Sequence, residues 1–152
     1  MKISTQLAAS LACIALAGPA TAQTAGVTPG QWEIAVTINS MEMTGVPAGV
    51  ARMMVGKTTR VKHCMTPEEA ARGPQDLLRT DKSCVFKRYS MVNGRLSSEM
   101  SCKQGGDVMT AVTEGRFDAT SFTATGRSTT TGQMPVAMTS TSVGRWRGEC
   151  RR

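Results

Sequence analysis

The dipeptide Asn93-Gly94 constrains the fold more than any other feature, because it lies between two stretches in which apolar and polar residues alternate. Asn-Gly readily adopts the two positive φ angles of a two-residue type I′ turn, which joins neighbouring antiparallel strands. This turn fixes a register in which Arg88 lies opposite Glu99. The same register places Val85 opposite Cys102. The sequence therefore predicts an antiparallel β-hairpin here.

Alternation of this kind recurs along the chain. Residues 31–43 begin with alternating apolar side chains and then change phase by one residue, which predicts a β-bulge near Asn39-Ser40. Residues 44–49 contain Gly45 and Pro47 and are expected to form a loop. Further strands are expected over about residues 52–65, 108–117, 120–130 and 134–147.

A short helix interrupts this β pattern. Thr66 is a favourable N-cap, Pro67 suits the first helical position, and Glu69 completes a capping box. Gly73-Pro74 then ends the helix after about two turns. With short turns between the other elements, the predicted fold is all-β: a single strongly curved antiparallel sheet, a meander that is open or closed like a barrel, with one short helix.

The first 22 residues have the organisation of a signal peptide. Lys2 supplies a positive charge, Leu7–Ala17 is almost wholly apolar, and Ala20-Thr21-Ala22 has the small-x-small pattern that signal peptidase cleaves. A membrane anchor is the weaker alternative, because the apolar run is about half of the roughly 20 residues that a spanning helix needs. We expect a signal peptide over residues 1–22, one domain over residues 23–152, and a periplasmic or secreted protein.

Four cysteines remain once this segment is removed: Cys64, Cys84, Cys102 and Cys150. In a small exported domain they predict two disulfides, because the compartment is oxidising. A zinc site is the weaker alternative, since zinc-binding cysteines normally occur in pairs two to four residues apart. The hairpin register places Cys84 and Cys102 on opposite faces of the sheet. This favours the pairs Cys64–Cys84 and Cys102–Cys150.

Several motifs of the remaining chain, taken as a set, resemble one family. They are Pro29-Gly30-Gln31-Trp32-Glu33, a Met-rich early strand, Cys64 followed by Thr66-Pro67-Glu68, Asp81-Lys82-Ser83-Cys84, Cys102 and a closing Gly148-Glu149-Cys150. In this combination the chain resembles the domain-of-unknown-function family 3617, whose members are exported bacterial proteins. The resemblance implies an exported domain with disulfides, but no reaction and no catalytic residue.

A more distant resemblance is to lipocalins. Gly30-Gln31-Trp32 has their Gly-x-Trp motif at the start of the first strand, and Arg145 lies in the last strand, where such barrels place an arginine over that tryptophan. That stacking would be a cation–π contact. The alternative is that Trp32 is a core residue and that Arg145 flanks Trp146 on a surface.

No sequence pattern predicts catalysis. The one histidine, His63, precedes Cys64, which we expect to be oxidised and so unable to act as a nucleophile. No nucleophile elbow, zinc-protease motif, phosphate loop or dinucleotide fingerprint occurs. We therefore expect a non-enzymatic protein without a cofactor.

The methionines raise one metal-binding hypothesis. Thioethers with an imidazole can bind Cu(I), which is a soft ion. The residues that would bind it are Met41, Met43, Met53, Met54 and His63. Methionine also fills irregular cores, and this chain has only 3 Phe and 1 Tyr, so core packing is the favoured interpretation.

The chain is basic, with a formal net charge of +7 that becomes +6 when Lys2 is removed. Export and the scarcity of aromatic residues argue against a nucleic-acid partner. Anionic envelope lipids or acidic polymers fit the charge better. The alternative, which we favour from sequence alone, is a solvated surface that keeps the protein soluble.

These features predict a small binding or interaction module of the bacterial envelope. It would be an apolar-ligand carrier, a Cu(I)-binding protein, or an interaction protein without a small-molecule site. An apolar ligand, such as a lipid, would lie against one face of the curved sheet. The residues predicted to line that face are Trp32, Ile34, Val36, Tyr89, Met91, Met134, Val136 and Met138.

Overall fold

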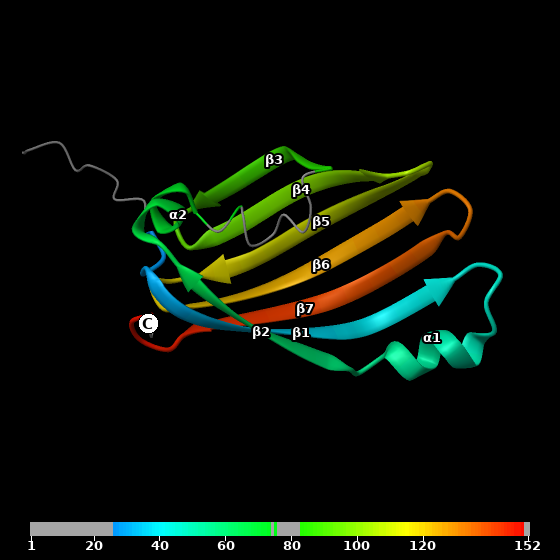
Figure 1. Cartoon of the computed structure of the whole chain (residues 1–152), viewed down its shortest axis with the longest axis horizontal. Coiled ribbons are helices and arrows are strands. Elements are labelled where there is room, and N and C mark those ends of the chain that lie inside the picture. Colours follow the sequence, from blue (N-terminus) through cyan, green and yellow to red (C-terminus); the bar gives the residue numbers. More distant parts are fainter. Residues whose placement is uncertain (1–25, 74, 76–82, 151–152) are drawn as a thin grey trace, which may run out of the picture.

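The computed structural model describes residues 26–73, 75 and 83–150, which form one antiparallel seven-stranded sheet and two short helices (Figure 1). The strands are β1 (Gly30–Met43), β2 (Thr58–Met65), β3 (Cys84–Val92), β4 (Arg95–Gln104), β5 (Asp107–Phe117), β6 (Ser121–Thr131) and β7 (Val136–Trp146), and the helices are α1 (Ala48–Met54) and α2 (Pro67–Arg72). The predicted all-β fold with a single antiparallel sheet is confirmed. Within these ranges, no helix has the length and apolar character needed to cross a bilayer.

The strand order is β2-β1-β7-β6-β5-β4-β3. Strands β3 to β7 follow one another as a meander, and β1 pairs with both β7 and β2. The edges are β2 and β3, so in the described part of the chain the sheet is not closed. The two successive strands β2 and β3 are not paired with each other. The chain leaves β2 through α2 rather than through a tight turn that would pair the two strands.

The register divides the sheet into two faces, because directly opposed residues project from the same side. We call the side from which Trp32 projects, with Trp146 opposite it, the apolar face. The side from which Glu33 projects, opposite Lys62 on β2 and Arg145 on β7, is the basic face. No Lys or Arg of the seven strands projects from the apolar face.

The turn and bulge predicted from sequence are both confirmed. Asn93 and Gly94 have φ angles of 51° and 71°, as the type I′ turn requires. In β1 the register shifts between Ile38 and Ser40, so Asn39 is the additional residue. Its Nδ2 donates to Thr141 Oγ1 at 2.8 Å, which gives the bulged side chain a partner on β7.

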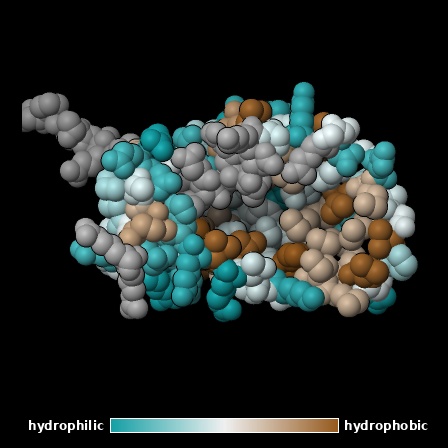
Figure 2. All heavy atoms as spheres, in the orientation of Figure 1, coloured by the Kyte–Doolittle hydropathy of each residue, from teal (hydrophilic) through white to brown (hydrophobic). Residues whose placement is uncertain are grey.

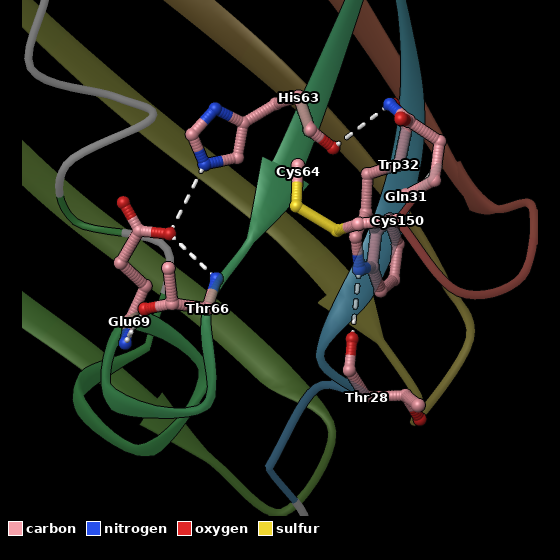
Figure 3. Close-up of polar contacts among 8 residues, drawn as sticks. All are labelled: Thr28, Gln31, Trp32, His63, Cys64, Thr66, Glu69 and Cys150. Carbon is pink, nitrogen blue, oxygen red and sulfur yellow. Dashed lines mark hydrogen bonds and ion pairs between the residues drawn. A yellow bond between two sulfur atoms is a disulfide. The ribbon is translucent and has the colours of Figure 1, made fainter. Parts of the chain in front are cut away.

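The predicted helix α2 and its capping box are also confirmed. Thr66 Oγ1 accepts from the Glu69 backbone N–H at 3.2 Å, and Glu69 Oε2 accepts from the Thr66 N–H at 2.8 Å (Figure 3). Gly73, with a φ of 79°, ends the helix. The side chains of Thr66 and Glu69 therefore fix the start of this six-residue element, and the backbone of Gly73 fixes its end.

The prediction for residues 44–65 was partly wrong. A loop over 44–49 and a strand from residue 52 were expected, but α1 occupies Ala48–Met54 and β2 begins only at Thr58. The helix starts after Pro47, which offers no side-chain cap, so the signal that marks α2 is missing. Gly56, with a φ of 81°, then returns the chain to β1 by donating its N–H to the Ile38 carbonyl at 2.8 Å.

The predicted disulfide pairing was wrong, although two disulfides are present: Cys64–Cys150 and Cys84–Cys102. The reason is a second bulge, in β3, where the register shifts between Phe86 and Arg88. Lys87 is the additional residue, so Cys84 rather than Val85 lies opposite Cys102, with a Cα–Cα distance of 3.9 Å. The bulge thus brings both cysteines to the same face.

The main core lies at one end of the apolar face, which we call the capped end. There α2 and Val27 pack with Trp32, Met65, Leu96, Phe117 and Ala124. Trp32 is completely buried, and its Nε1 donates to the Thr28 carbonyl at 2.8 Å (Figure 3). Phe122 stacks on it with ring centroids 6.0 Å apart, and Gly144 admits the Phe122 ring because a Cβ there would overlap it.

The stacking of Arg145 on Trp32, which the lipocalin resemblance would imply, does not occur. Arg145 is paired with Glu33 and projects from the basic face, whereas Trp32 projects from the apolar face. Trp32 is therefore a core residue covered by Phe122, and Arg145 flanks Trp146 on the exposed surface, as in the alternative interpretation.

Candidate functional site

Seven of the eight residues predicted to line a ligand site project from the apolar face. They are Trp32, Ile34, Val36, Tyr89, Met91, Val136 and Met138. Met134 is the exception, because it precedes β7, next to Pro135, and its side chain is 62% exposed. The period-two pattern therefore located the shared face but extended it beyond the strand.

A cavity of about 420 Å³ lies beside α2 at the capped end. Tyr89 and Met91 line it together with Val27 and Ala70. The Tyr89 hydroxyl donates to Met91 Sδ at 2.8 Å, and burial raises the pKa of Tyr89 to about 12. The cavity is therefore lined by apolar side chains, by one hydroxyl that is neutral at ordinary pH, and by the cationic Arg72.

Small side chains occupy the centre of the apolar face. The register brings them together on the two middle strands: Ala124, Gly126 and Ser128 from β6, and Ser140, Ser142 and Gly144 from β7. Ile34 and Val36 on β1 border this strip on one side, and on the other side β5 adds Ala111, Thr113 and Gly115 before the larger Met100 on β4. The two middle strands therefore carry little side-chain bulk between apolar walls.

The end of the face opposite the capped end has apolar residues on both sides of this strip, and we call it the open end. Met41, Met43, Val136 and Met138 are only half-buried there, on β1 and β7. Across the strip, a second cluster contains Cys84, Met100 and Cys102, with Phe86, Met109 and Ala111 packed against it. The described elements that cover the face, α2 and Val27, pack at the other end.

Helix α1 extends the apolar surface at the open end. It lies beside the second half of β1, in line with β2 (Figure 1). Only Ala51 of the helix is buried. The side chains of Val50, Met53, Met54 and Val55 are 46%, 69%, 38% and 40% exposed. Figure 2 shows apolar side chains gathered at this right-hand end of the molecule.

The five residues of the metal hypothesis do not come together. Met41 and Met43 lie at the open end of β1, and Met53 and Met54 lie on the neighbouring α1. His63 is opposite Trp32, at the other end of β1, so about nine residues of strand, or roughly 30 Å, separate it from Met41. Its Nε2 lies 3.3 Å from Glu69 Oε2 on α2 (Figure 3). Any soft-metal site would therefore have to use the methionines without His63.

Sequence reasoning identified the small residues Ser140, Ser142 and Gly144 on the last strand, but it missed the apolar surface of α1 and the small residues that β6 adds to the same face. The helix gave no capping signal, and its residues were assigned to a loop and a strand. The small residues carried a signal that was available: Gly126 and Ser128, and Ser140 and Ser142, alternate with larger polar residues along two expected strands. Their common position emerges only when β6 and β7 are paired.

A family model described as a protein of unknown function, DUF3617, matches residues 27–150. The chain belongs to this family. The DUF3617 match begins at Val27, which helps to cover the capped end, and ends at Cys150, the partner of Cys64. Both faces of the sheet and both disulfides are therefore features of the matched segment. No curated protein and no solved structure gives a significant match.

Proposed function

We propose that this DUF3617 protein is an exported, non-enzymatic module that binds an apolar ligand, of the size of a lipid acyl chain, along the apolar face. The observation that carries the proposal is the open end. There, half-buried Met41 and Met43 on β1 and Val136 and Met138 on β7 adjoin a strip of small side chains, and no lysine or arginine of the strands projects from this face. Removing such apolar surface from water is favourable by about 25 cal/mol per Å².

The chemistry of the walls supports a chain-like ligand rather than a polar one. Met41, Met43 and Met138 have unbranched, polarisable side chains that adapt to ligands of different shape. The small residues of β6 and β7 are Gly, Ala and Ser. The serine hydroxyls are uncharged, so these residues place no charge along the apolar face. This arrangement is typical of a site that selects for apolarity and length more than for a particular polar group.

Titration with N-phenyl-1-naphthylamine, a neutral apolar fluorophore, tests the proposal directly. The protein is expected to enhance its emission saturably. Ser128→Leu would fill the centre of the apolar face and weaken binding several-fold. Thr129→Leu is the matched control, because the neighbouring residue of β6 projects from the basic face. No saturable enhancement, or equal losses in both variants, would contradict the proposal.

Native mass spectrometry of protein recovered from cells without detergent identifies what the site holds. A retained mass of lipid size would support apolar-ligand binding and give its class. A retained mass of one copper ion would instead favour the alternative function, a methionine-only site formed by Met41, Met43, Met53 and Met54. The same spectrum reports whether residues 1–22 have been removed.

A further inference from the structure

The lysines and arginines of the sheet all lie on one side. The strands contain nine such residues: Arg60, Lys62, Lys87, Arg88, Arg95, Lys103, Arg116, Arg127 and Arg145. Eight project from the basic face by register, and Lys87, at the β3 bulge, reaches Glu99 on that face at 3.8 Å. Every strand except β1 contributes to this charge.

Few carboxylates neutralise these charges. Glu99 pairs with Arg88, with Arg88 Nη2 2.6 Å from Glu99 Oε2. Glu33 pairs with Arg147, which follows β7, at 3.0 Å. Hydrogen bonding to these arginines holds the pKa of both carboxyl groups below its usual range, so both stay ionised. The other acids of this face, Glu42 and Glu114, leave a large excess of positive charge.

One cross-strand pair shows the excess most clearly. Arg95 on β4 lies directly opposite Arg116 on β5, and neither forms an ion pair with any residue that the structure describes. Directly opposed like charges destabilise a sheet. The pair borders a depression of about 450 Å³, lined also by Ser97, Glu114 and Thr125. An anionic partner would relieve this repulsion.

The distribution of the charges indicates an extended partner rather than a small anion. Neighbouring strands are about 4.8 Å apart, so charges on β2 through β3 extend over roughly 29 Å. No single phosphate could contact more than a few of them. Three valines project from the same face with their side chains strongly exposed: Val85 at 60%, Val92 at 50% and Val112 at 43%. Exposed apolar side chains among cations suit the interface of a membrane.

We propose that the basic face docks on the surface of a bilayer that contains anionic phospholipid. The cations would lie at the headgroups, Arg95 and Arg116 would contact phosphate oxygens, and the valines would enter the interface. Guanidinium groups suit this role because they donate in a planar fork that matches phosphate. The proposal concerns the opposite side of the sheet from the apolar-ligand site and does not depend on it.

Co-sedimentation with vesicles tests the proposal. The protein is expected to sediment with vesicles of equimolar phosphatidylglycerol and phosphatidylcholine, not with phosphatidylcholine alone, and to be released by high salt. Arg95→Gln with Arg116→Gln should weaken binding several-fold, because both charges leave the face. The matched control, Arg52→Gln with Lys57→Gln, removes the same charge from residues outside the strands and should have a much smaller effect.

Three results would overturn the proposal. They are absence of binding to the anionic vesicles, equal losses in the two double variants, and binding to heparin without binding to vesicles, which would indicate an acidic polysaccharide. Circular dichroism and thermal unfolding establish that each variant is folded. Arg95→Gln with Arg116→Gln should still bind N-phenyl-1-naphthylamine, and Ser128→Leu should still bind vesicles, so the two proposals fail separately.

Discussion

The two ends of the apolar face are built from the same strands but differ in what covers them. At the capped end, Trp32 is completely buried under Phe122, and Val27 and Ala70 complete the cluster. At the open end, Met43 and Val136 of the same β1–β7 pair are only half-buried. A continuous sheet can therefore bury its main core at one end, while at the other end its β1–β7 side stays half-buried across from the smaller cluster of Cys84, Met100 and Cys102.

Each end also has its own disulfide. At the capped end, Cys64–Cys150 joins the edge strand β2 to the segment after β7. At the open end, Cys84–Cys102 joins two strands that are already neighbours in a hairpin. The comparison predicts that substitutions at the capped end cost more stability, and that substitutions on the half-buried β1–β7 side of the open end mainly change binding.

The largest contrast is expected between the two disulfides. Replacing both Cys64 and Cys150 by Ala should lower the free energy of unfolding by about 4 to 5 kcal/mol, because the bond closes a loop with a sequence separation of 86. Replacing Cys84 and Cys102 should cost about 3 kcal/mol, because the separation is 18. Urea unfolding measures both. A larger loss for the open-end pair would contradict the comparison.

Single core substitutions should show the next largest difference. Trp32 is the one large side chain that is fully buried among residues 26–73, 75 and 83–150, and Trp32→Ala should cost about 3 to 5 kcal/mol. Met41→Ala, on the same strand and face but half-buried at the open end, should cost about 1 kcal/mol. Met41→Ala should instead weaken binding of N-phenyl-1-naphthylamine. Similar unfolding free energies for both variants would show that the core extends farther along β1.

Ionisation of Tyr89 offers a spectroscopic test of the capped end. Because the folded-state pKa is raised from 10 to about 12, the neutral phenol stabilises the fold fully below pH 10. This contribution should disappear as the pH rises from about 10 through 12. The chain has a single tyrosine, so absorbance of the phenolate at 295 nm reports this residue alone. Half-ionisation near pH 10 in the folded protein would show that the cavity beside α2 is solvated.

The smallest effect is expected from the ion pairs of the basic face. The pKa values of Glu33 and Glu99 are lowered by hydrogen bonds to Arg147 and Arg88, so their contribution is present above the ordinary pKa near 4.5. It should diminish as the pH falls below that value, and Glu33→Gln and Glu99→Gln should flatten this dependence slightly. Carboxyl titration by NMR checks the direction; an ordinary pKa at either residue would exclude a stable ion pair there.

The features predicted correctly were those set by neighbours in sequence. Asn93-Gly94 set its turn, the phase change after Ile38 marked the β1 bulge, and Thr66 with Glu69 defined the start of α2. The shared face of the candidate ligand residues followed from strict alternation. Each of these signals depends only on residues a few positions apart, so it can be interpreted without knowing how the rest of the chain folds.

Most of the errors, but not the disulfide pairing, arose where a tertiary partner decides the outcome. Helix α1 packs at the edge of β1 and has no capping side chain, so the local sequence carries no signal that predicts it. The β3 bulge did leave a signal, because Phe86 is out of phase with Tyr89 and Met91, the same kind of phase change that revealed the β1 bulge. Applying that rule to β3 would have placed Cys84 opposite Cys102. By contrast, the cover of the apolar face depends on elements far apart in sequence.

The pairing of β1 with β7 has a consequence for folding kinetics. Its contacts join residues as distant as Glu33 and Arg147, which are 114 positions apart, whereas β3 to β7 are linked by successive hairpins. Closing long loops slows folding, so the meander of β3 to β7 should assemble first. β1 and β2 should then pair with the edge of β7 in a later step. During that interval the unpaired edge of β7 is open to the wrong strand, including one from another copy of the chain.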